Sequence, residues 1–191
     1  MTDLAAIIDM SICPIGDDTF IANCRDQLER DGVITIPGFI RPEALAALVA
    51  EAEAEKLNAF FTSSTHNAYL TPARDDLPPT HVFNRQINSS KGCITTDQVS
   101  PGSALHTIYD SDSFRRFLAA TVGEKALYEY ADPLSSINVH FADEGQELGW
   151  HFDNSSFAVT LLLQAPRNGG QFQYVRDPRD ADAGDMNYQG V

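Results

Sequence analysis

Apolar positions along the chain predict three helices. Between residues 17 and 30, apolar residues recur every four positions, and Gly32 follows as a stop signal. The alanine- and leucine-rich stretch 41–57 opens with a proline that suits a first helical turn. A third helix is expected over 111–122, with a polar N-cap and Gly123 at its end. All three are expected to pack an apolar face against the rest of the domain.

Short apolar runs predict strands, and most of them follow the helices. The first is the β-branched run 33–36, which ends in a Pro-Gly turn. Three more are expected over 136–141, 157–164 and 171–175, separated by glycine-containing turns. Helices followed by consecutive strands indicate an α+β fold with a mainly antiparallel sheet or barrel.

The segment 61–101 is rich in Ser, Thr, Asn, Asp and Pro, which favour local turns. It is therefore expected to be a long irregular excursion, and long loops of this kind frequently act as lids over sites. A chain of 191 residues suits a single domain. Its parts are the helices and first strand (1–60), the irregular lid region (61–110), and a helix with core strands (111–191).

Composition narrows the function classes. The formal net charge is −14, and a field of that sign repels nucleic acid. No apolar run is long enough to span a membrane, and the N-terminus lacks the basic start of a secretory signal, so we expect a cytoplasmic protein. The chain has three cysteines, Cys13, Cys24 and Cys93. An odd number without close spacing argues against a disulfide framework and against a thiolate zinc site. The oligomeric state is left open.

The segment that carries chemistry is Gly-Trp-His-Phe-Asp-Asn at 149–154. Residues two apart in an extended chain project to the same side, so His151 and Asp153 can hold one metal ion while Phe152 packs on the other side. An imidazole and a carboxylate are two of the three ligands in the facial triad of non-haem Fe(II) oxygenases. A lone His-x-Asp is a weak signal for a metal site. The strands expected directly after it make a metal-binding role better supported here.

Three stretches carry a family resemblance. Gly-Trp-His-Phe-Asp, Phe-Ala-Val-Thr-Leu-Leu-Leu-Gln and Gly-Gly-Gln-Phe-Gln-Tyr resemble the metal-binding strand and following hairpin of 2-oxoglutarate-dependent oxygenases. The stretch 31–39 and its helix are similar to the opening of phytanoyl-CoA-dioxygenase-like members. From 137 onwards the chain most resembles the bacterial branch that contains free-amino-acid halogenases and hydroxylases.

The resemblance implies a double-stranded β-helix (jelly-roll) core, an Fe(II) ion, 2-oxoglutarate as co-substrate, and O2. It implies that His151 and Asp153 are iron ligands and that the substrate is a small polar metabolite such as a free amino acid. Halogenases of this branch have glycine where this chain has Asp153, which leaves an iron position open for chloride. A carboxylate fills that position, so we expect hydroxylation.

Four further residues are candidates for binding. Asn138 could contact 2-oxoglutarate, although a structural amide fits equally well. His140 shares a predicted strand face with it and is either a substrate contact or a hydrogen-bonded structural histidine. Trp150 and Asn154 flank the metal pair and could touch substrate, and Trp150 suits core packing as well.

All histidines lie at or before the predicted pair: His66, His81, His106, His140 and His151. The family takes its third ligand, and the basic residue that holds 2-oxoglutarate, from positions well after this pair. Either the chain is a fragment that ends before the last core strands, which we favour, or it is a short protein with an altered site. The rival function is a non-catalytic β-barrel that binds or scaffolds and has lost its metal site.

Overall fold

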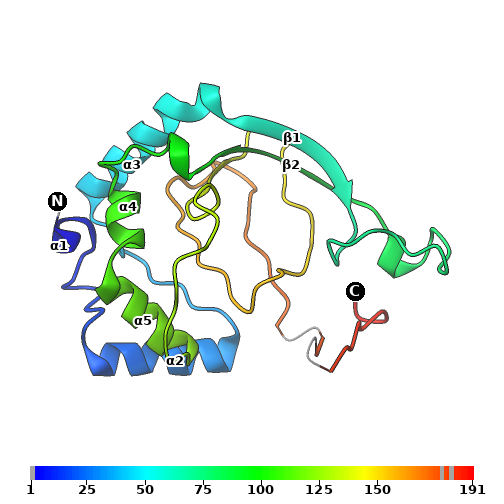
Figure 1. Cartoon of the computed structure of the whole chain (residues 1–191), viewed down its shortest axis with the longest axis horizontal. Helices are drawn as coiled ribbons and strands as arrows, with labels where there is room; N and C mark the ends of the chain where they lie inside the picture. The colour runs from blue at the N-terminus through cyan, green and yellow to red at the C-terminus, as the bar shows by residue number, and fades with distance from the viewer. Residues whose placement is uncertain (1–2, 177–178, 181–182) are drawn as a thin grey trace. The chain divides into compact units, whose positions relative to one another are not determined.

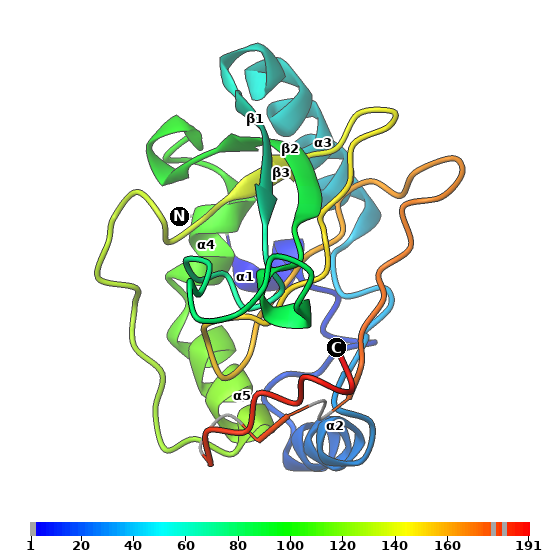
Figure 2. The ribbon, with the colours of Figure 1, turned by 90° about the vertical axis from the view of Figure 1, so that its right-hand side faces the viewer.

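The computed structural model describes residues 3–176, 179–180 and 183–191. The chain divides into two compact units, each built from two chain segments. Unit 1 comprises Met1–Ala59 and Ile94–Val139, and unit 2 comprises Phe60–Cys93 and His140–Val191. Figure 1 labels the helices α1 to α5 and the strands β1 and β2, and Figure 2 also labels β3.

Unit 1 is helical. Its elements are α1 (Leu4–Ile7), α2 (Asp18–Asp31), α3 (Pro42–Glu55), η1 (Lys56–Asn58), η3 (Thr96–Gln98), α4 (Ala104–Tyr109) and α5 (Asp112–Val122). The helices α2, α3 and α5 confirm the three that the sequence predicts. The others were not expected, because helices of four and six residues are too short to show a periodic pattern.

The ends of α2 and α5 follow from single residues. The Asp17 side chain accepts a hydrogen bond from the Phe20 N–H at 2.8 Å, which satisfies a free donor of the first turn of α2. Ser111 caps α5 in the same way. Both helices end at a left-handed glycine, with φ of 73° at Gly32 and 79° at Gly123.

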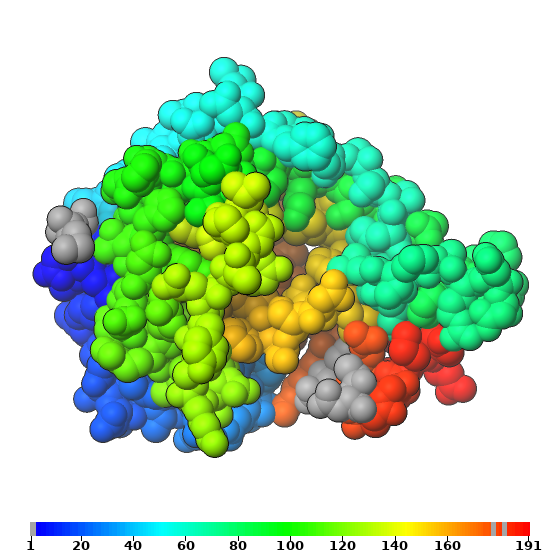
Figure 3. Space-filling model, in the orientation of Figure 1, coloured from blue at the N-terminus to red at the C-terminus, as the bar shows by residue number. Residues whose placement is uncertain are grey.

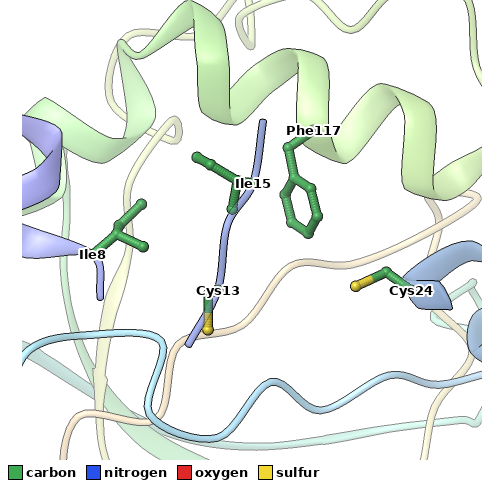
Figure 4. Packing of buried hydrophobic residues seen from close by; sticks show 5 residues of the cluster. All are labelled: Ile8, Cys13, Ile15, Cys24 and Phe117. Carbon is green, nitrogen blue, oxygen red and sulfur yellow. The ribbon is translucent and has the colours of Figure 1, made fainter. Parts of the chain in front are cut away.

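The core of unit 1 lies between α2 and α5, which pack against each other with their axes inclined (Figure 1). The rings of Phe20 and Phe117 stack with centroids 5.9 Å apart. Figure 4 shows the buried residues of this cluster: Ile8, Cys13, Ile15, Cys24 and Phe117. Burial raises the pKa of both thiols, so Cys13 and Cys24 are expected to be unreactive core residues.

One buried hydroxyl in this unit has no partner. Among the described residues, the Thr121 Oγ1 on α5 is buried without a hydrogen bond. Valine has the same shape and carries no group that needs a partner, so Thr121→Val is expected to raise the free energy of unfolding by about 1 kcal/mol. Urea denaturation measures the change. A loss of stability in the valine variant would contradict this, and Thr121→Ser, which removes the methyl group instead, is expected to destabilise.

The segment 124–136 runs over the surface of unit 1, in yellow-green in Figure 3. Its tyrosines are exposed, at 88% for Tyr128 and 64% for Tyr130. The segment is held near its end by the Thr96 hydroxyl, which lies 2.9 Å from the Ser136 hydroxyl and accepts a hydrogen bond from the Ile137 N–H at 2.8 Å.

Unit 2 is built on an antiparallel hairpin. Strands β1 (Phe60–His66) and β2 (Ile87–Ile94) pair from Phe60↔Cys93 to His66↔Ile87, and η2 (Val82–Asn84) precedes β2. The short strand β3 (Val139–Phe141) lies on the other edge of β2, which gives a three-stranded sheet among the described residues (Figure 2). The molecule is therefore α+β, as expected.

The hairpin contradicts the expectation of an irregular excursion over 61–101. β1 and β2 are rich in Ser, Thr and Asn, which in a sequence favour turns. These residues nevertheless form two strands that pair over seven residues. Only the part between the strands is largely irregular. The expectation of irregular structure is therefore wrong for β1 and β2, and the lid role predicted for the segment stays a prediction.

Several expected strands are not regular strands in the structure. Residues 33–36, 157–164 and 171–175 are irregular, and only the end of 136–141 is a strand. A strand needs a neighbour for its backbone N–H and C=O groups. Among the described residues, no backbone hydrogen bond joins 157–164 or 171–175 to another segment. Apolar side chains there are correspondingly exposed, including Leu162 at 72% and Phe172 at 78%.

In the part of the chain that the structure describes, no helix combines the length and apolar character needed to cross a membrane.

Candidate metal centre

The segment that carries His151 and Asp153 is held against the edge of β2. The Ser90 N–H donates to the Glu147 carbonyl at 2.7 Å, and the Gly149 N–H donates to the Ser89 hydroxyl at 3.3 Å. Further along, the Phe152 N–H donates to the Ala68 carbonyl at 2.8 Å. These bonds fix the backbone on both sides of His151.

Gly149 is the tightest point of this arrangement. A Cβ at this position would lie 2.5 Å from the Asn88 carbonyl oxygen and 2.6 Å from the Ile87 Cγ2. It would also lie 3.3 Å from the His66 Nε2. Only glycine lets the backbone approach β2 this closely.

Phe152 packs into an aromatic cluster of unit 2. Its ring stacks on Tyr69 with centroids 5.2 Å apart, beside the buried ring of Phe83. The guanidinium of Arg179 lies 4.0 Å from the centre of the Phe152 ring, a cation–π contact. Phe152 thus anchors the segment in the core of unit 2, although 151–153 is not a regular strand.

The carbonyl of Gly149 selects the tautomer of the neutral His151 ring. It lies 2.7 Å from the His151 Nδ1. Because a carbonyl can only accept, Nδ1 carries the hydrogen in the neutral ring and Nε2 presents its lone pair. Histidines that bind metals are commonly oriented in this way, by a hydrogen bond from the ring nitrogen that does not bind the ion.

The free nitrogen of His151 faces Asp153. Its Nε2 lies 3.5 Å from the Asp153 Oδ1, which is too long for a good hydrogen bond. Two lone pairs that face each other repel unless a proton or a cation lies between them. Two donor atoms bound to one ion at about 2.1 Å each lie roughly 3–4 Å apart, so this pair suits a divalent cation. Both side chains reach solvent, at 30% and 56% exposed.

A second histidine, which the sequence did not single out, lies beside the pair. The His66 ring, at the end of β1, meets the His151 ring edge-on with centroids 5.9 Å apart. The His66 Nδ1 lies 3.0 Å from the Asn67 carbonyl, so it too presents Nε2. This contact could not be predicted from the sequence, because it depends on the hairpin of β1 and β2, which was not expected.

These residues fit a metal as a two-ligand pair. Among the described residues, no group of three His, Cys, Asp or Glu side chains has a geometry that could hold an ion. His66 therefore neighbours the pair and is not assigned as a ligand.

The remaining predicted residues occupy different places. Trp150 is 50% exposed beside the pair, so it is not a core residue, and Asn154 is exposed at the end of the segment. His140 lies on β3, with its Nε2 3.2 Å from the Lys91 Nζ. Asn138 belongs to unit 1, where its amide donates to the Ser135 carbonyl at 3.1 Å. The binding roles of all four stay predictions.

The fold and site define an α+β protein with an imidazole–carboxylate pair suited to a divalent cation. A family model described as Halogenase D matches residues 16–185, so the chain belongs to this family. Membership indicates an enzyme of halogenase or oxygenase type. No curated protein and no solved structure matches the chain.

Proposed function

We propose that this chain belongs to an Fe(II)- and 2-oxoglutarate-dependent oxygenase that hydroxylates an unactivated C–H bond of a small polar metabolite. The observation that carries the proposal is the close approach of the His151 Nε2 and the Asp153 Oδ1, 3.5 Å apart. Membership in the Halogenase D family supports an oxidative reaction. The proposal includes a double-stranded β-helix core, to which the three-stranded sheet would contribute.

The chain's own residues would hold and orient the ion. His151 supplies a neutral imidazole nitrogen, because the Gly149 carbonyl keeps the hydrogen on the other ring nitrogen. Asp153 supplies a carboxylate oxygen and offsets part of the ion's charge. The chemistry that Fe(II) supplies when bound is oxidation of a C–H bond to an alcohol by O2, coupled to conversion of 2-oxoglutarate to succinate and CO2. The third ligand is not assigned to a residue of this chain.

Asp153 also decides between hydroxylation and halogenation. A halide must bind the iron directly if it is to be transferred, and the resemblance places glycine at this position in halogenases. Here a carboxylate occupies the position beside His151. It would fill the coordination place that chloride needs, so we propose that the product is an alcohol although the family carries a halogenase name.

A substrate screen tests the reaction. The protein, loaded with Fe(II), is incubated with 2-oxoglutarate, O2 and each common amino acid, and succinate is measured. We expect at least one amino acid to raise succinate formation well above the rate without substrate. The hydroxylated product gains 16 mass units, whereas a chlorinated one would gain about 34. If no amino acid raised succinate formation, free amino acids would be excluded as the substrate class.

The alternative is a barrel that binds or scaffolds without catalysis. It would bind no Fe(II) or Mn(II) at His151 and Asp153. Isothermal titration calorimetry with Mn(II), which O2 does not readily oxidise at neutral pH, distinguishes the oxygenase from the non-catalytic barrel. It needs no knowledge of the substrate.

A further inference from the structure

One face of the hairpin is polar and carries the candidate metal pair at one end. Residues that pair directly across antiparallel strands project to the same side. The pairs His66↔Ile87, Ser64↔Ser89 and Thr62↔Lys91 therefore share a face. His66 lies against His151 at one end of this face, and Lys91 lies four residues further along, roughly 14 Å away at ~3.4 Å per residue.

Lys91 is a lysine that, in the part of the chain the structure describes, lacks a carboxylate partner in a strongly acidic protein. The chain has 27 acidic and 13 basic residues, yet among the described residues no carboxylate pairs with Lys91. Its side chain is only partly exposed. Removing an ammonium from part of its water without an anion costs free energy, which a bound anion would recover.

The partner of Lys91 is a histidine on the neighbouring strand. The Lys91 Nζ lies 3.2 Å from the His140 Nε2, and an ammonium can only donate, so the histidine nitrogen accepts. Burial and the charge of Lys91 both lower the pKa of His140, which keeps its ring neutral at pH 7. The pair therefore carries a single positive charge, with its ammonium held in place by His140.

We propose that Lys91, positioned by His140, binds a carboxylate of an organic acid on the same face as the metal pair. The hydroxyls of Thr62, Ser64 and Ser89 lie on the same face and can donate further hydrogen bonds. The single positive charge of Lys91 balances the single negative charge of a carboxylate, whereas a doubly charged phosphate would keep an unbalanced charge in an acidic protein. The carboxylate comes either from 2-oxoglutarate or from the substrate. This inference rests on the proposed function for the identity of the acid, and the binding itself does not require a metal.

Binding measurements test the site. The single tryptophan of the chain, Trp150, serves as a fluorescence probe, with isothermal titration as a second readout. The probes are 2-oxoglutarate, its monoamide without the distal carboxylate, L-leucine and L-leucinamide, each with and without Mn(II). Inorganic phosphate and chloride serve as control anions. The variants are Lys91→Met, which keeps the stem and removes the charge, and Lys91→Arg, which keeps the charge. Lys125→Met, at an exposed lysine of unit 1, is the matched control.

We expect Lys91→Met to weaken binding of one carboxylate by about ten-fold or more, as for loss of a charge-assisted hydrogen bond. Lys91→Arg is expected to keep most of the affinity, and Lys125→Met to change it less than about two-fold. A loss confined to 2-oxoglutarate assigns the site to the co-substrate, and a loss confined to leucine assigns it to the substrate. The corresponding amide is expected to bind weakly to the wild type and to be insensitive to Lys91→Met.

Two results would overturn the inference. One is unchanged carboxylate affinity in Lys91→Met, with a thermal midpoint equal to that of the wild type. The other is an equal loss for inorganic phosphate and chloride, which would mean general charge attraction. If the proposed metal site is wrong and the anion site is right, Mn(II) will not bind, while carboxylate binding will still depend on Lys91.

Discussion

Replacing Asp153 by alanine is expected to lower the affinity for Fe(II) and Mn(II) by more than about 100-fold and to abolish succinate formation. Groups that merely orient a metal ligand contribute about 10–100-fold to affinity, so loss of a ligand should exceed that range. The Asp153 carboxylate faces the His151 Nε2 at 3.5 Å, and without it only the imidazole remains of the pair. Mn(II) titration under calorimetry measures the change.

A matched control separates ligation from net charge. Glu144 is an exposed carboxylate in the same unit, so Glu144→Ala removes one negative charge away from the pair. It should leave Mn(II) affinity within about two-fold of the wild type. If Glu144→Ala and Asp153→Ala reduced affinity equally, the ion would be responding to the general negative field of the protein, and the assignment of Asp153 as a ligand would be lost.

The helices of unit 1 were predictable because their signals are local. Asp17 and Ser111 accept hydrogen bonds from first-turn N–H groups, and Gly32 and Gly123 end the same helices in the left-handed conformation. Each signal needs only residues within a few positions along the chain. Tertiary packing therefore had little opportunity to change them.

The sheet was much less predictable, because strand pairing joins distant residues. β1 and β2 contain few apolar residues in alternation, and η2 and irregular chain separate them. The seven-pair register of β1 and β2 places His66 opposite Ile87, where the segment of Gly149 and His151 lies. The neighbouring strand β3 brings His140 to Lys91. The sequence could indicate His151 and Asp153 from their own spacing. It could not indicate their neighbours, which come from the hairpin.

Replacing Gly149 by alanine is expected to destabilise unit 2 by about 3 kcal/mol and to weaken metal binding as well. The new Cβ would lie 2.5 Å from the Asn88 carbonyl oxygen and 2.6 Å from the Ile87 Cγ2. The first of these atoms belongs to the backbone of a paired strand and cannot turn aside, so the penalty falls at the upper end of that for overpacking. Urea denaturation followed by Trp150 fluorescence measures the loss.

The same displacement would move the carbonyl that orients His151. The Gly149 carbonyl lies 2.7 Å from the His151 Nδ1, so moving it away from β2 loosens the imidazole that faces Asp153. Mn(II) affinity is expected to fall by about ten-fold even at temperatures where the variant stays folded. Gly16→Ala is the control, because its Cβ would meet no atom within 4 Å and its φ is not positive. Unchanged stability in Gly149→Ala would mean that the segment does not approach β2 this closely, and the orientation assigned to His151 would fail with it.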